Sequence, residues 1–249
     1  MSLMLGRLGW AIGVSAVAWA LSLAIAAPAQ EAKRPFVPTA DYETRMVEGW
    51  TVRVNRHLLS DRKALGDSAL RLLTEKLYDV RRAVPERACA ELQRIPIWLG
   101  VDDGHAPCAE YHPSRDWLRE NGYNPDKAKG VEIGNATRFL EWSKSQPAMI
   151  LHELAHGYHD QVFGYENTRI RAAFDAAKQG GAYESVLRSN GQTERHYALS
   201  NPQEYFAEGS EAYFGTNDFY PFVRAELQRH DPGLTKLLGE VWAGPPSQK

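Results

Sequence analysis

A mostly apolar stretch in the second half of the chain reads Met149-Ile150-Leu151-His152-Glu153-Leu154-Ala155-His156-Gly157-Tyr158-His159. Its centre has the pattern His-Glu-x-x-His. If the stretch is helical, His152 and His156 are one turn apart and share a face, so their imidazoles can bind one zinc ion from the same side. Glu153 then lies beside the metal, where a carboxylate can take a proton from the attacking water. The pattern therefore predicts a zinc hydrolase.

The residues around this motif favour a mostly apolar, buried helix. Pro147 suits a helix start, because its missing N–H falls among the donors that the first turn leaves unpaired. Apolar side chains then surround the motif at Met149, Ile150, Leu151, Leu154 and Ala155. Burying two histidines and a glutamate in such a helix costs free energy unless they have partners, which a metal supplies. The alternative is that these are ordinary surface or core histidines.

Length and composition fit an ordinary globular domain. The 249 residues are enough for a sizeable core, and 43% of them are hydrophobic, which is typical of a folded chain. The formal net charge is −2, with no basic excess of the kind that attracts nucleic acid and no acidic tail. We therefore expect no nucleic-acid partner.

The N-terminal segment has the features of a secretory signal peptide. Arg7 is its single charged residue, residues 8–26 are apolar, and two small-x-small sequences end at Ala26 and Ala29. We predict a signal peptide over residues 1–29, cut after Ala29 or alternatively after Ala26. The mature protein is then secreted or periplasmic and leaves the membrane. The alternative is an uncleaved anchor, because the apolar run is long enough to span a bilayer.

Export of the protein would place its two cysteines in an oxidising compartment. Cys89 and Cys108 are the whole complement, and an even pair in an oxidising compartment most simply forms a disulfide. Such a bond would close a loop of about twenty residues and stabilise the fold by roughly 3 kcal/mol in the chain-entropy model. Metal binding by this pair is less favoured, because it lacks the close Cys-x-x-Cys spacing.

Residues 30–249 are expected to form a single catalytic domain with an α+β fold. Residues 30–92 make an N-terminal hairpin and helical part, and residues 93–249 contain the sheet and the zinc site. A small mixed sheet packs on the helix that carries the motif, and the C-terminal part is mostly helical. Periodicity and turn residues predict strands at 42–46, 50–54, 95–100 and 130–134, a hairpin around Asn190-Gly191, and helices at 61–84, 86–92, 114–118, 135–142, 166–178 and 201–214.

Residues 130–134 hold a particular place in this order. They come one helix before the motif, so we expect them to form an edge strand above the metal, where an extended substrate can pair with backbone groups. His105 and His112 have no ligand spacing to each other and are expected in a loop or at the rim of the site.

A second informative stretch begins at Asn201, which can cap a helix that runs to Phe214. Glu204, Glu208 and Glu211 follow at positions i, i+4 and i+7 beside large aromatic residues. We interpret Glu204 as the third zinc ligand. Glu208, one turn later, would accept the other ring N–H of a ligating histidine. The alternative is a solvated acidic stripe, an interpretation that suits Glu211.

His159 is a rival for the third ligand, because it shares a helix face with His152. Seven residues of helix separate the two, about 10.5 Å along the axis. Zn–N bonds of about 2.0–2.1 Å cannot bridge that distance from one ion. The extended motif with a third histidine also fails, because it needs glycine and histidine where this chain has His159 and Val162.

Together, His152-Glu153-Leu154-Ala155-His156 and the run 201–208 resemble the zincin-type (gluzincin) catalytic domain of anthrax toxin lethal factor and its relatives. In that family the third ligand is the glutamate directly before two aromatics and Ala-Glu, which corresponds to Glu204. A tyrosine seven residues earlier stabilises the oxyanion, which implies this role for Tyr197. The alternative for Tyr197 is an aromatic side chain packed at a strand end. The resemblance covers residues 148–214 and implies a zincin-like fold.

The sequence thus predicts a secreted metallopeptidase with Zn2+ as cofactor and a peptide or protein substrate. Its ligands are His152, His156 and Glu204, and its catalytic residues are Glu153 and Tyr197. A hydrolase of a non-peptide amide, such as a cell-wall component, would share this whole metal site. A binding protein that retains zinc without turnover is the third possibility, although a structural site usually has a fourth protein ligand.

Overall fold

A computed structural model describes residues 36–102, 104 and 108–243. These residues cluster as one compact unit. The predicted signal peptide, residues 1–29, lies outside the described residues. Within them, no helix has the length and apolar character needed to cross a membrane.

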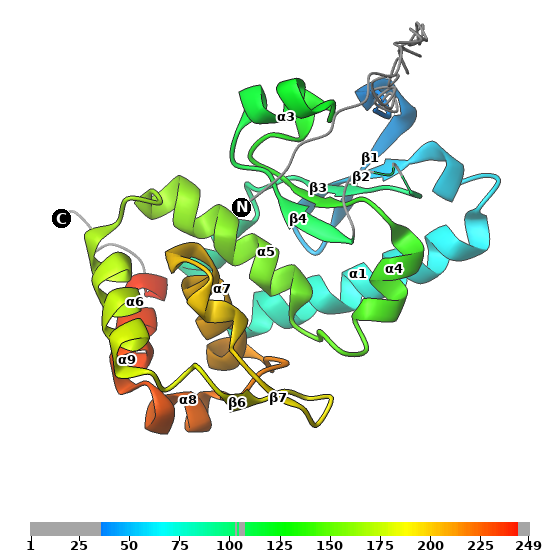
Figure 1. The fold of residues 1–249 in the computed structure, drawn as a ribbon. Helices are drawn as coiled ribbons and strands as arrows, with labels where there is room; N and C mark the ends of the chain where they lie inside the picture. Colours follow the sequence, from blue (N-terminus) through cyan, green and yellow to red (C-terminus); the bar gives the residue numbers. More distant parts are fainter. Residues whose placement is uncertain (1–35, 103, 105–107, 244–249) are drawn as a thin grey trace, which may run out of the picture. The chain divides into compact units, whose positions relative to one another are not determined.

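The fold is mixed, with a small sheet and many helices, as an α+β fold requires (Figure 1). In the described part of the chain, one sheet has the strand order β1-β2-β3-β5-β4. Its strands are β1 (Tyr42–Val47), β2 (Trp50–Asn55), β3 (Ile97–Leu99), β4 (Ala109–Tyr111) and β5 (Val131–Ile133), and a separate hairpin joins β6 (Val186–Leu187) to β7 (Thr193–Glu194). The α-helices are α1 (Lys63–Ala83), α2 (Glu86–Leu92), α3 (Arg115–Asn121), α4 (Ala136–Trp142), α5 (Met149–Tyr158), α6 (Thr168–Gly180), α7 (Pro202–Phe214), α8 (Arg224–His230) and α9 (Pro232–Trp242).

Most predicted elements are confirmed, and local signals explain them. The β1–β2 hairpin turns at Glu48 and Gly49, which both have positive φ, of 51° and 97°. Two such residues suit the tight turn whose twist matches that of the strands. Asn135 caps α4, since its side chain accepts the N–H of Arg138. Caps and turns are set by neighbours in sequence, so they can be predicted from it.

The sheet edge differs from expectation. Strands β2, β3 and β5 are parallel, and β4 pairs antiparallel with β5. The predicted strand 130–134 is thus β5, which lies inside the sheet, and the edge strand beside α5 is β4. Residues 109–111 carry no recognisable strand signal, because three residues are too few to show alternation.

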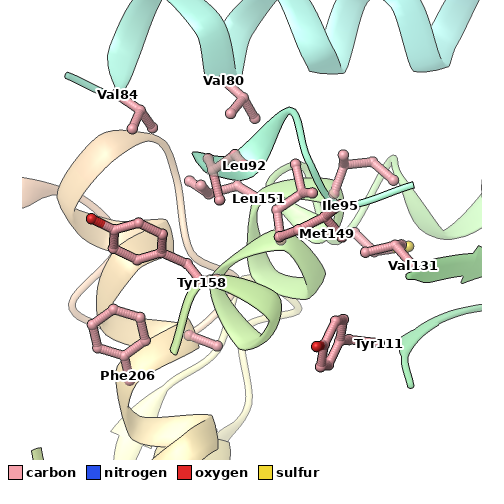
Figure 2. Close-up of a cluster of buried hydrophobic side chains, with 14 of the residues drawn as sticks. Val80, Val84, Leu92, Ile95, Tyr111, Val131, Met149, Leu151, Tyr158 and Phe206 are labelled. Atoms are coloured by element: carbon pink, nitrogen blue, oxygen red, sulfur yellow. The ribbon is translucent and has the colours of Figure 1, made fainter. Parts of the chain in front are cut away.

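Helix α5 lies between the sheet and the C-terminal helices, as Figure 1 shows. Figure 2 shows the apolar residues around it: Met149 and Leu151 lie toward Leu92 and Ile95, and Tyr158 lies beside Phe206. All six are buried in one continuous core cluster. This burial fixes the rotation of α5 about its axis, and so decides which face its polar residues present.

The C-terminal helices close the other side of α5. Trp242 of α9 stacks on Tyr158 of α5, with ring centroids 4.3 Å apart, and lies 5.8 Å from Phe206 of α7. Gly209 brings α7 close to α9, because a Cβ there would lie 2.6 Å from a methyl carbon of Leu234. Helices α5, α7 and α9 therefore form one packed group.

The predicted disulfide is wrong. Cys89 and Cys108 are both free, buried and not near each other. Cys89 lies in α2, which leads into β3, whereas Cys108 precedes β4, and β5 separates these two strands. Spacing along the chain carried no information on this separation. The Cys108 thiol instead donates to Met149 Sδ at 3.5 Å, and burial raises its pKa to about 12.

Candidate metal centre

Helix α5 supplies two side chains that converge on one point. Its apolar residues, Ile150 and Leu154 among them, are buried, so the opposite face points away from the core. His152 and His156 occupy that face one turn apart, with ring centroids 4.7 Å apart. The spacing read from the sequence therefore places both imidazoles side by side.

Helix α7 supplies the third side chain. Asn201 caps the helix by accepting the N–H of Glu204 at 2.9 Å, and Pro202 occupies the first helical position. The body of α7 packs along α5. The capped first turn consequently holds the Glu204 carboxylate against the histidine pair.

Three ligand atoms face one another at this point. His152 Nε2 lies 3.0 Å from His156 Nε2, and Glu204 Oε2 lies 3.1 Å and 3.3 Å from these two nitrogens. Atoms bound tetrahedrally at 2.0–2.1 Å from zinc lie about 3.3–3.4 Å apart. The observed spacings are close to these values, and two imidazoles plus one carboxylate are a donor set that zinc favours. The residues therefore fit a zinc ion.

The electrostatics of this trio match a cation site. Burial opposes charge on Glu204, but hydrogen bonds with His152 and His156 outweigh it and lower the pKa of this carboxyl below its usual range. The carboxylate form is the one that binds a metal. The side chains are 11–15% exposed, so one side stays open.

Glu211 holds the His152 ring from behind. Its Oε1 lies 2.7 Å from His152 Nδ1. An imidazole that binds metal through Nε2 carries its proton on Nδ1, so this N–H donates to the carboxylate and fixes the ring orientation. Glu211 is 4% exposed. Its interpretation as part of a solvated stripe is therefore wrong.

Glu208, predicted for that role, lies farther away. Its Oε1 is 3.8 Å from His152 Nδ1, beyond hydrogen-bond distance. Its Oε2 instead accepts from Asn217 Nδ2 at 2.7 Å. Burial and the neighbouring Glu211 carboxyl raise the pKa of Glu208 well above its usual value. Glu208 therefore lines the cleft near His152 but accepts no hydrogen bond from its ring.

This difference predicts unequal effects of two matched substitutions on zinc affinity. Glu211→Gln removes the negative charge that makes His152 a stronger ligand, so the zinc dissociation constant should rise about ten-fold, the lower end for such outer partners. Glu208→Gln keeps an oxygen that accepts from Asn217 and should change the constant less than about two-fold. Competition with a chromophoric chelator measures both. Equal losses in the two variants would contradict the assignment.

A cleft of about 420 Å³ opens over the trio. Its walls come from β4, α4, α5, α7 and the segments around them, and they include Cys108, Ala109, Glu110, Trp142, Met149 and Asp218. Glu153 lies in this cleft, and its Oε2 accepts the backbone N–H of Tyr111 at 2.8 Å. Burial raises the pKa of the Glu153 carboxyl, which His152 and His156 partly oppose.

Tyr197 also lines the cleft. It lies in the 3-10 turn Tyr197–Leu199, between β7 and α7, and not at a strand end. The side chain is 50% exposed, so it is not a packed structural aromatic. Burial of its inner part and the nearby Glu204 raise the pKa of the phenol, which keeps the hydroxyl as a donor.

His112 and His159 lie apart from the trio. His112 lies in the loop after β4, as one of the two expectations had it, but it is buried, and its Nε2 lies 2.7 Å from Glu132 Oε2. Lys127 forms an ion pair with the same glutamate, so a cation already occupies that cluster. His159 is fully buried between Tyr165 and Phe206, and burial lowers its pKa to about 4. His105 lies outside the described residues.

The site thus joins two helices and an edge strand. Two contacts at the site were not predicted from the sequence: that of Glu211 with His152, and that of Tyr111 with Glu153. A helical-wheel count identifies the first, and no local signal identifies the second. No family model matches this sequence, and no curated protein or solved structure matches it.

Proposed function

We propose that this protein is a zinc-dependent metallopeptidase. The single observation that carries the proposal is the convergence of His152 Nε2, His156 Nε2 and Glu204 Oε2 within 3.0–3.3 Å, in the same cleft as the carboxylate of Glu153. Three ligands and an adjacent carboxylate are the arrangement of a catalytic zinc site, which keeps one position open. The fold would then be of the zincin type, as the resemblance to the lethal factor catalytic domain implies.

Zinc, when bound, supplies a Lewis acid that polarises a carbonyl and acidifies water. The protein's own groups do the rest. Glu153 accepts a proton from the attacking water and passes it to the leaving amine. The Tyr111 N–H holds one oxygen of that carboxylate, which leaves the other to face the water. Tyr197 donates a hydrogen bond from its hydroxyl to the developing oxyanion, a contact whose loss typically costs about 10²–10³ in rate.

The edge strand favours a peptide substrate. Backbone groups of Cys108 and His112 bond to the β5 side, at Gly134 and Gly130. In an antiparallel pair the alternate residues turn their backbone groups outward, so Ala109 presents N–H and C=O to the cleft. An extended chain can pair with such an edge. The apolar segment at residues 8–26 supports action outside the cytoplasm.

The test is cleavage profiling of a peptide library by the purified protein, with and without a chelator. We expect cleavage that the chelator abolishes and that added Zn2+ restores. Cell-wall fragments run in parallel decide between a peptide and a non-peptide amide. Bound zinc with no turnover of either substrate would refute the proposal and leave a binding protein.

A further inference from the structure

The strand beside the general base is short and weakly attached. Strand β4 has three residues and pairs with a single neighbour, β5. An edge strand of this length gains little from its own ladder. Yet the Tyr111 N–H must stay 2.8 Å from Glu153 Oε2 for the carboxylate to keep its orientation. Something outside the sheet has to hold this strand in place.

The Tyr111 side chain provides that attachment. Its hydroxyl donates to Asp160 Oδ2 at 2.6 Å and accepts from Gln161 Nε2 at 3.0 Å. Lys129 Nζ donates to the same Asp160 oxygen at 2.6 Å. Asp160 and Gln161 belong to the π-helical turn His159–Phe163, which continues directly from α5. Tyr111 therefore has two attachments: its amide contacts Glu153 in the middle of α5, and its hydroxyl contacts the turn that follows α5.

Close packing sets the distance between β4 and α5. The Tyr111 ring lies over Gly157, where a Cβ would come within 3.0 Å of the ring and within 2.6 Å of Ile95. A glycine at this position lets the strand approach the helix that carries the motif. Tyr111 is 7% exposed, so its hydroxyl has little access to water and relies on these partners.

We propose that Tyr111, anchored by Asp160, is a positioning residue that holds edge strand β4 and, through its own N–H, the Glu153 carboxylate in the geometry needed for proton transfer. Its effect on turnover rests on the proposed peptidase function. The anchoring itself does not, because it concerns the protein without substrate. Misplacement of a catalytic group by about 1 Å can cost 10²-fold in rate, so a loosened strand has a measurable cost.

Two variants test the anchor, with a matched control. Tyr111→Phe removes the hydroxyl and keeps the ring, and Asp160→Asn keeps the shape and removes the charge. Tyr78→Phe makes the same change on α1, at a half-exposed site outside the cleft. Measurements are hydrogen exchange of the Tyr111 amide, zinc content, and kcat and KM on a cleaved peptide.

In both anchor variants, exchange of the Tyr111 amide should speed up about ten-fold or more, and kcat should fall about ten-fold. KM and zinc content should change less than about two-fold, because neither substituted group binds substrate or metal. The control should match the wild type. Unchanged exchange overturns the proposal, and so does faster exchange with unchanged kcat. If the wild type cleaves nothing, the proposed function fails, and the exchange rates still decide whether Tyr111 is an anchor.

Discussion

Glu153→Gln should keep its zinc and lose about 10²–10⁴-fold in kcat on any peptide that the wild type cleaves, the range for removal of a general base. The amide is nearly the same shape as the carboxylate, so the three ligands are undisturbed. It can accept the Tyr111 N–H but cannot take a proton from water. Zinc content by elemental analysis and single-turnover cleavage of one library peptide measure the two halves of this result.

Glu110→Gln is the control for this experiment. Glu110 precedes Tyr111 on β4 and lines the same cleft as Glu153. It has no role in the proposed proton transfer. Its amide variant should retain most of the activity. A Glu153→Gln enzyme that turns over at the wild-type rate would show that another group accepts the proton, and would remove the central assignment.

Glu204→Ala should abolish stable zinc binding. Two imidazoles then remain as ligands, and the affinity for zinc should fall by more than about 100-fold. That factor is the upper figure for residues that contact a ligand but not the metal itself. A ligand that binds the folded state adds about 2.7 kcal/mol to stability at 100 times its dissociation constant. Added zinc should therefore raise the melting temperature of the wild type and leave that of Glu204→Ala unchanged.

The stability readout separates metal binding from catalysis. Glu166→Ala is the control, because Glu166 lies on the surface with its side chain 90% exposed, paired only with Arg171. Its melting temperature should rise with zinc as the wild type's does. A zinc-dependent rise that persists in Glu204→Ala would mean that the ion binds elsewhere, and the trio would lose its role.

The two helices of the site were predictable because their signals are local. The spacing of His152 and His156 and the cap at Asn201 need no knowledge of distant contacts. Glu211 was also within reach of the sequence. At 3.6 residues per turn, seven residues return to within about 20° of the starting direction, whereas four overshoot by about 40°. Around the helix axis, Glu211 therefore points in nearly the same direction as Glu204, and Glu208 deviates more from it.

The edge strand and the cysteines were not predictable in this way. Strand β4 exists because Ala109 and its neighbours pair with β5, 20 to 24 residues later in the chain. Pairing at that separation is decided by the whole sheet and leaves no pattern in three residues. The same sheet order keeps Cys89 and Cys108 apart, so one missed strand explains both errors.

The stacking of Trp242 on Tyr158 has a consequence for the order of synthesis. Trp242 belongs to the last described helix of a chain of 249 residues, yet it packs against both α5 and α7. Chains emerge from the ribosome N-terminus first, and incomplete cores stay loosely packed. The helices that carry His152 and Glu204 thus lack this packing partner until α9 has been synthesised. We expect a nascent chain that stops before α9 to be unable to hold His152, His156 and Glu204 together.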